Sequence, residues 1–149
     1  LLRDALGNIK NFEIHDSKQR VIPSNLVKID EKNQIAIIEC IGIEKINSVD
    51  WIEVDNQSQV SVINLAGSKN IGINAEIDSI NESLGIVKIT ATDGELESGS
   101  VLLSSNKIAG IIIAQKPSMV LSISTSKIKK SIDDLIQNKT IQNKTTIQL

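Results

Sequence analysis

The stretch of residues 93–113, DGELESGSVLLSSNKIAGIII, holds two aliphatic runs separated by a polar turn. Valine and isoleucine favour strands, whereas serine and asparagine favour turns. The pattern therefore predicts a β-hairpin whose strands span residues 101–104 and 107–114. The segment Glu97-Ser98-Gly99-Ser100 directly before the hairpin is polar, so we expect it in a loop.

Short β-branched runs, punctuated by glycine, asparagine, aspartate and serine, continue on both sides of this hairpin. Turn residues recur roughly every 8–12 residues, the spacing expected of β-sandwiches and barrels. Apolar and polar residues alternate over residues 71–78, which indicates a strand with one buried face. The expected strands span residues 12–15, 21–29, 35–41, 60–63, 71–80, 84–90, 101–104, 107–114 and 119–122.

One amphipathic helix is expected after the last strand. Ser124 or Ser126 can cap its start, and apolar residues then recur with the helical period. The apolar face consists of Ile128, Ile132, Leu135 and Ile136. Strands in hairpin-like succession followed by one helix predict an antiparallel β-barrel closed by a helix.

The composition argues against several classes of function. The net charge is -2 and aromatic residues make up 1% of the chain, which disfavours binding to nucleic acid or to an anionic membrane. No apolar stretch approaches the roughly 20 residues that a membrane span needs. Cys40 is the single cysteine, so neither an internal disulfide nor a cysteine-based zinc site is expected. We expect no cofactor and no metal.

The hairpin and the loop before it resemble a motif of the trypsin-like serine proteases, especially the bacterial HtrA-type group. In these proteases a Gly-Asn/Asp-Ser-Gly-Gly/Ser motif precedes a short apolar strand, a turn, and a strand that contains a glycine. Residues 97–103 are similar to the first part, and Gly110 matches the glycine of the second strand. A further strand like residues 119–123 and a closing helix like residues 128–136 follow in that group.

Upstream segments resemble the same family in the same order. Residues 16–30 are similar to its "dGr.y.A.vv..D" hairpin, residues 33–38 to its "nDlAvL" strand, and residues 1–5 to the segment after its catalytic histidine. The resemblance covers about residues 1–137 and implies an all-β fold. It implies the second trypsin-like antiparallel β-barrel plus part of the first, closed by a C-terminal helix.

The chain is expected to have three segments, of which the resemblance implies the first two. Residues 1–50 would be the remainder of an N-terminal β-barrel, and residues 51–137 the C-terminal β-barrel with its closing helix. Residues 138–149 are polar and nearly repeat themselves, so they are expected to form a tail or linker. A two-barrel protease has several strands before its histidine, and an open barrel would leave strand edges unpaired. We therefore expect a missing upstream segment or a homo-oligomer to cover that side.

The catalytic positions implied by the resemblance are altered. Serine acyl transfer needs a nucleophile, a base, a carboxylate that orients the base, and amides that bind the oxyanion. Ser98 occupies the nucleophile position, and Gln34 stands at the aspartate position. Leu96 replaces the glycine of the oxyanion hole, and Glu97 replaces the Asp/Asn beside the serine. The family's histidine would fall just before Leu1.

The only histidine, His15, lies in the expected strand 12–15, and we interpret it as a surface or edge-strand residue. The first hypothesis is accordingly a non-catalytic trypsin-like domain, a pseudoprotease, which binds a peptide or protein or acts as a scaffold. The alternative is a fragment of an active trypsin-like serine endopeptidase with Ser98 as nucleophile and its histidine upstream of Leu1. A purely structural β module is the third possibility.

A separate group of acidic residues is a candidate for metal binding. Asp50, Glu53 and Asp55 surround Trp51 and could hold Ca²⁺. Their spacing lacks the ligands and the glycine of an EF-hand loop. A solvated loop anchored by Trp51 is the favoured interpretation.

Overall fold

The computed structural model describes residues 13–16, 18–30, 32–33, 35–43, 48–64, 71–116 and 119–145. The chain divides into two compact units, Val49–Lys129 and a second unit that combines Leu1–Ser48 with Lys130–Leu149. Gln34, the residue at the implied aspartate position, lies outside the described residues.

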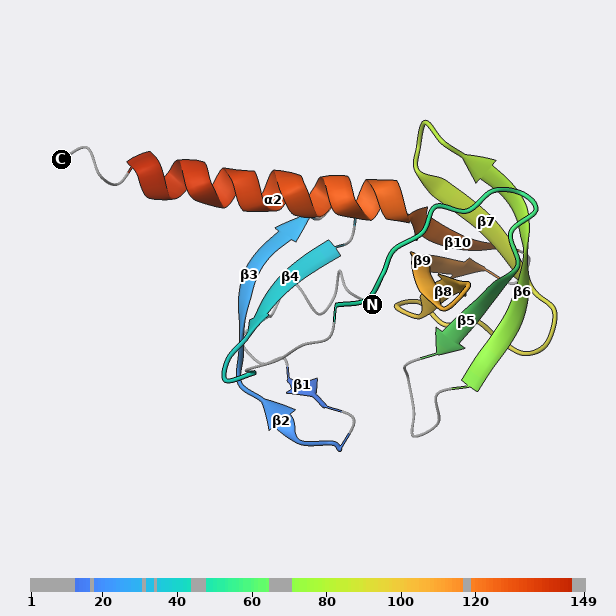
Figure 1. The fold of residues 1–149 in the computed structure, drawn as a ribbon, viewed down its shortest axis with the longest axis horizontal. Coiled ribbons are helices and arrows are strands. Elements are labelled where there is room, and N and C mark those ends of the chain that lie inside the picture. Colours follow the sequence, from blue (N-terminus) through green and yellow to red (C-terminus); the bar gives the residue numbers. More distant parts are fainter. Residues whose placement is uncertain are drawn as a thin grey trace. The chain divides into compact units, whose positions relative to one another are not determined.

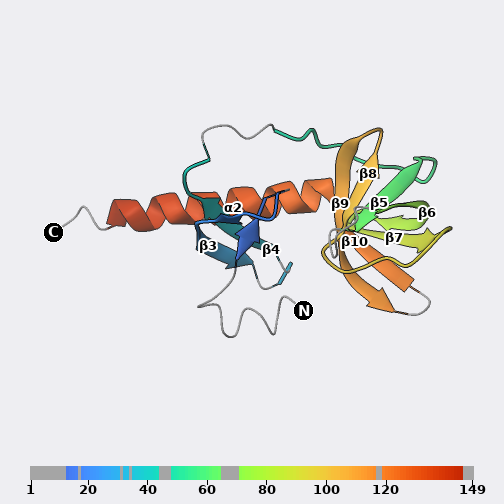
Figure 2. The same cartoon turned by 90° about the horizontal axis from the view of Figure 1, so that it is seen from below.

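The Val49–Lys129 unit is a closed barrel of six antiparallel strands (Figures 1 and 2). Around the barrel the strand order is β10-β7-β6-β5-β8-β9, and β10 also pairs with β9. Because β5, β6 and β7 are consecutive and β8 returns to lie beside β5, this order contains a Greek key. The strands are β5 Val60–Asn64, β6 Ile71–Asn81, β7 Ile86–Ala91, β8 Val101–Ser104, β9 Lys107–Lys116 and β10 Met119–Ser124. The predicted antiparallel β-barrel is confirmed.

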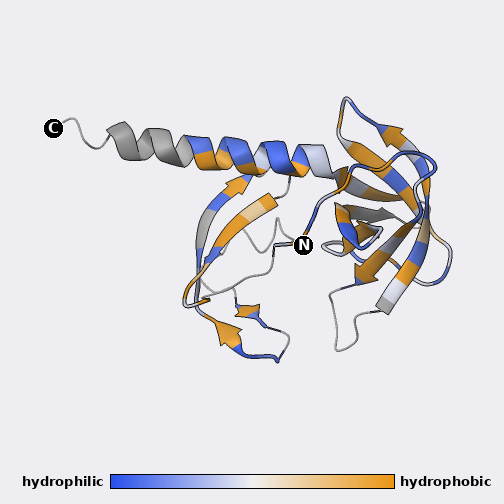
Figure 3. Ribbon diagram, viewed as in Figure 1, coloured by the Kyte–Doolittle hydropathy of each residue, from blue (hydrophilic) through white to orange (hydrophobic). Residues whose placement is uncertain are grey.

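The barrel interior is filled by aliphatic side chains. Hydrophobic and hydrophilic residues alternate along several of the barrel strands (Figure 3). In β6, Ile73 and Ala75 are buried while Asn74 and Glu76 are exposed, as the predicted alternation requires. The buried cluster consists of Val60, Val62, Ile73, Ala75, Val87, Ile89, Leu96, Leu102, Ala109 and Ile112. All ten of these residues are aliphatic, so this cluster packs without aromatic side chains.

The hairpin of β8 and β9 has the turn that its sequence predicts. Ser104 pairs with Lys107, and the two residues between them, Ser105 and Asn106, have φ angles of 50° and 60°. Positive φ at both central residues is the geometry of a type I′ turn, whose twist matches that of paired strands. In β9, Gly110 passes so close to β10 that a Cβ there would lie 2.5 Å from the carbonyl oxygen of Ile123.

The other unit contains two short antiparallel pairs. Strand β1, Ile14–His15, pairs with β2, Val21–Ile22, and β3, Ser24–Asp30, pairs with β4, Ile35–Cys40. The predicted strand 21–29 is therefore interrupted at Pro23, since proline has no N–H to donate to a ladder.

The helix, α2, runs from Thr125 to Thr145. The hydroxyl oxygen of Ser124 accepts a hydrogen bond from the N–H of Lys127 at 3.4 Å, so Ser124 serves as the N-cap. Of the predicted apolar face, Ile128 and Leu135 are buried, but Ile136 is 53% exposed. The helix continues through most of the segment for which the sequence predicts a tail, since no glycine or proline interrupts residues 138–145. Among the described helical residues, no segment is long and apolar enough to cross a membrane.

Candidate functional site

The loop between β7 and β8 carries Ser98, and its first residues are fastened to strand β6. The N–H of Thr92 donates to the carbonyl of Asn74 at 2.9 Å. The carboxylate of Asp93 accepts hydrogen bonds from the N–H of Asn74 at 2.6 Å and from its side-chain amide at 3.0 Å. The start of the loop is thus held by both main-chain and side-chain contacts.

Asn64, the last residue of β5, holds the middle of the loop through two side-chain hydrogen bonds. Its side-chain NH₂ donates to the carbonyl of Glu95 at 2.8 Å, and its side-chain oxygen accepts the hydroxyl hydrogen bond of Ser100 at 2.8 Å. Ser100 is 2% exposed, so this is a buried polar contact that needs its partner. Sequence reasoning missed Asn64; the only signal is an amide that follows the aliphatic run of β5.

Ser98 and Gly99 form a tight turn within this loop. The N–H of Ser100 donates to the carbonyl of Glu97 at 3.1 Å, and the N–H of Gly99 donates to the carbonyl of Ile112 at 2.7 Å. Gly99 has a φ of 89°, which glycine adopts without a steric penalty. Ser98 is exposed, and within the described part of the chain no side chain is hydrogen-bonded to its hydroxyl. The turn therefore presents this hydroxyl to solvent.

Leu96 and Glu97, the two residues before Ser98, have opposite environments. The side chain of Leu96 is 2% exposed and belongs to the barrel core, whereas Glu97 is exposed. The φ angle of Leu96 lies outside the positive region, although Gly94 and Gly99 on either side have φ angles of 109° and 89°. The loop thus uses its glycines, and not Leu96, where the backbone turns.

His15 and Ser98 belong to different units of the chain. The side chain of His15 is 40% exposed, and its Nε2 lies 3.1 Å from Oε2 of Glu13. Its position in β1, paired with Val21, is that of a residue on a short two-stranded sheet.

The acidic residues around Trp51 lie in a segment that contacts strand β9 at one end and forms a turn at the other. Trp51 forms a bridge with Ile108, and the carbonyl of Asp50 accepts the N–H of Ile108 at 2.8 Å. Hydrogen bonds from the Ser58 hydroxyl and the N–H of Gln57 lower the pKa of Asp55. Across the residues that the structure describes, no group of three His, Cys, Asp or Glu side chains is placed to hold a metal ion.

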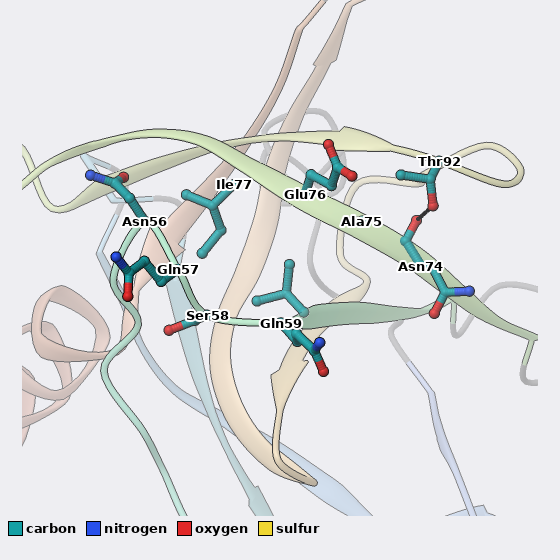
Figure 4. A pocket seen from close by; sticks show the side chains of 10 residues that line it. Asn56, Gln57, Ser58, Gln59, Asn74, Ala75, Glu76, Ile77 and Thr92 are labelled. Carbon is teal, nitrogen blue, oxygen red and sulfur yellow. Dashed lines mark hydrogen bonds between the residues drawn. The ribbon is translucent and has the colours of Figure 1, made fainter.

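A second feature of the barrel is a groove of about 560 Å³ beside strand β6 (Figure 4). One wall is the segment Asn56–Gln59 before β5, and the other is Asn74–Ile77 of β6. Its remaining lining residues are Val60 and Thr92. Most of these side chains are amides or hydroxyls, so the groove offers hydrogen-bonding groups beside the apolar side chains of Val60, Ala75 and Ile77.

The chain matches no protein-family model, and no curated protein is significantly similar to it. The class that the structure defines is an all-β protein with a closed six-stranded antiparallel barrel and a C-terminal helix.

Proposed function

We propose that this chain is a non-catalytic domain of the trypsin-like type that binds a peptide or protein segment. The order of features along the chain supports the proposal. Three barrel strands, β5 to β7, precede the loop with Ser98, and three more, β8 to β10, follow it and lead directly into α2. This is the succession that the sequence motifs imply for the second barrel of such a protease.

The observation that carries the non-catalytic part of the proposal is the exposed hydroxyl of Ser98, which has no hydrogen-bonding partner among the described residues. A serine hydroxyl is a weak nucleophile unless a neighbouring base accepts its proton. Here it stands in an exposed turn, and none of the described side chains is hydrogen-bonded to it. Its chemistry is then that of an ordinary surface alcohol.

The environment of Leu96 supports the same conclusion. An oxyanion hole needs main-chain N–H groups aimed at the developing negative charge. The residue two positions before the serine would have to turn its backbone inward for that purpose. Leu96 instead has its side chain in the core and a backbone outside the positive-φ region. The packing of the barrel thus depends on the side chain that replaces the glycine.

A covalent probe tests the absence of an activated serine. The protein is incubated with a fluorophosphonate, which reacts with activated serine hydroxyls, beside trypsin as positive control. We expect trypsin to be labelled, and this protein to show no more labelling than its Ser98→Ala variant. Labelling that is lost on that substitution would establish the active endopeptidase instead.

Binding is tested separately with an array of synthetic peptides. We expect a subset of extended peptides to be retained, and the same subset to be retained by Ser98→Ala, because the proposed function does not use the hydroxyl. An array on which no peptide is retained would instead support a purely structural β module.

A further inference from the structure

Strand β6 is much longer than the strand beside it. It has 11 residues, whereas β5 has 5, and within β6 the partners of β5 are Ile71–Ala75 alone. Apart from Asp78, which lies at a bulge, the remaining residues of β6, Glu76–Asn81, pair with β7 and with no other described strand. One side of this part of β6 is therefore a strand edge within a barrel that is otherwise closed, and we call it the β6 edge.

Two residues direct their main-chain groups toward the β6 edge. The carbonyl of Asn74 is bonded to Thr92, so Asn74 faces the β7 side, and by alternation Ile77 faces the opposite side. The register of β6 on β7 then shifts between Ile77 and Ser79. The main chain of Lys88 faces β6, as that of Thr92 does, because residues two or four positions apart in a strand face the same way. Past the bulge Ser79 pairs with Lys88 and so faces β7. Ile80, the next residue, is therefore directed to the open side.

The groove lies along the start of this edge. Ile77 lines it opposite Asn56 and Gln57, and Figure 4 shows Glu76 pointing to the other side of β6 from Ile77. The segment across the groove closes on itself, since the N–H of Ser58 donates to the carbonyl of Asp55 at 3.1 Å. It therefore leaves space beside Ile77 instead of extending β5.

The charges near the edge are mainly acidic. Glu76 is exposed and is the only charged residue among the described residues that line the groove. Asp78 is the next carboxylate along β6, and it is partly balanced by Lys88, whose Nζ lies 3.7 Å from its Oδ2. A second copy of the chain paired along the same edge would bring like charges together, which is unfavourable in cross-strand positions. A basic strand has complementary charge.

We propose that the β6 edge binds a short, extended, basic peptide segment by strand addition, with the N–H and C=O groups of Ile77 and Ile80 as its hydrogen-bonding partners. This inference rests on the proposed function and names its site. The bulge at Asp78 spaces the two partners by three residues instead of two, which limits the length of regular pairing. The occupant is thus a short segment and not a long strand.

Amide hydrogen exchange, followed residue by residue by NMR, tests the proposal on the intact protein. The probe is a short synthetic peptide of alternating lysine and valine, and a peptide of alternating glutamate and valine is its control. We expect the lysine peptide at saturation to slow exchange at Ile77 and Ile80 by about tenfold or more. The amides of Ile73 and Ala75, which already lie opposite β5, serve as internal references and should change little.

A charge variant provides the second measurement. Glu76→Gln should weaken binding of the lysine peptide by about two- to fivefold, as expected for the loss of one exposed ion pair. Glu95→Gln, which neutralises another exposed carboxylate in the loop before β8, should leave the affinity for the lysine peptide unchanged.

If peptides bind the domain but leave Ile77 and Ile80 unprotected, the β6 site is wrong and the proposed function stands. If no peptide binds at all, both are wrong.

Discussion

The hydroxyl of Ser131 in helix α2 donates a hydrogen bond to the carboxylate of Asp30, the last residue of strand β3. Ser131 is 4% exposed. The same carboxylate accepts the N–H of Asn33 at 3.0 Å and its side-chain NH₂ at 2.6 Å. One side chain therefore both closes the turn between β3 and β4 and fastens that hairpin to the helix.

Removing the hydroxyl should destabilise the unit that contains this contact. Hydrogen bonds to charged groups contribute about 1.5–3 kcal/mol, so we expect Ser131→Ala to lower the free energy of unfolding by an amount in this range. Urea denaturation followed by circular dichroism measures it. The control is Asp134→Ala, an exposed position in the same helix, which should change stability by no more than about 0.5 kcal/mol. Equal losses in both variants would show that the contact contributes nothing specific.

The same carboxylate gives the domain a specific sensitivity to acid. Burial acts to raise the pKa of Asp30, but hydrogen bonds from Ser131 and Asn33 outweigh it and hold the pKa below its ordinary value of 3.8. A carboxyl group whose folded pKa is lowered stabilises the fold above its unfolded pKa, and this contribution disappears as pH falls through the folded pKa. The stability difference between the wild type and Asp30→Asn should therefore be constant near neutral pH and shrink below pH 4 or so.

Denaturation curves at a series of pH values measure this difference directly. The comparison with Asp30→Asn isolates one carboxylate, which matters because hydrogen bonds from Arg20 also lower the pKa of Asp16. Asp133→Asn, at an exposed position of α2, is the matched control and should show no such convergence. A gap that stays constant or grows in acid would contradict the role assigned to Asp30.

The strand pattern could be predicted from the sequence because it depends on local alternation. Residues 101–104 form a strand as predicted, and the Ser105-Asn106 turn follows from residue types that tolerate positive φ. Contacts between distant segments cannot be predicted from such a local pattern. Ser131 and Asp30 are 101 residues apart, and nothing in the helical period distinguishes Ser131 from a solvent-facing serine. Likewise, Ile136 fits the apolar face by spacing but is exposed, since burial depends on what packs against that turn.

At the candidate site, the exposed position of the Ser98 turn follows from its polar, glycine-containing sequence. The burial of Leu96 does not, because it lies between two acidic residues in a segment that reads as a loop throughout. The contacts of Asn64 could not be predicted either, because its partners Glu95 and Ser100 follow it in the sequence only after two further strands. The expected strands 60–63 and 71–80 are already unequal in length, but the β6 edge also depends on the register, which pairs β5 with Ile71–Ala75 of β6. Strand lengths alone do not predict that register.

Leu96 should be required for the stability of the barrel. Replacing a fully buried leucine by alanine removes buried surface and leaves a cavity, at a cost of about 2–5 kcal/mol. We expect Leu96→Ala to fall in this range in thermal or urea denaturation. Glu97→Ala is the adjacent control and should stay within about 0.5 kcal/mol, because Glu97 is exposed. A Leu96→Ala protein as stable as the wild type would show that this side chain can be replaced without loss of core packing.

Gly110 should not tolerate any side chain, because β10 leaves no space for one. A Cβ at this position would collide with the hydroxyl of Ser122 and lie 2.5 Å from the carbonyl oxygen of Ile123 in β10. The hydroxyl can rotate, but the carbonyl is part of the β9–β10 ladder, so the strands would have to separate. Overpacking of this kind costs about 1–3 kcal/mol. Gly72→Ala is the matched control, since a Cβ at Gly72 meets no atom within 4 Å. We expect Gly110→Ala to lower the free energy of unfolding by that amount while Gly72→Ala leaves it nearly unchanged, and equal stability of the two variants would show that β9 and β10 can move apart freely.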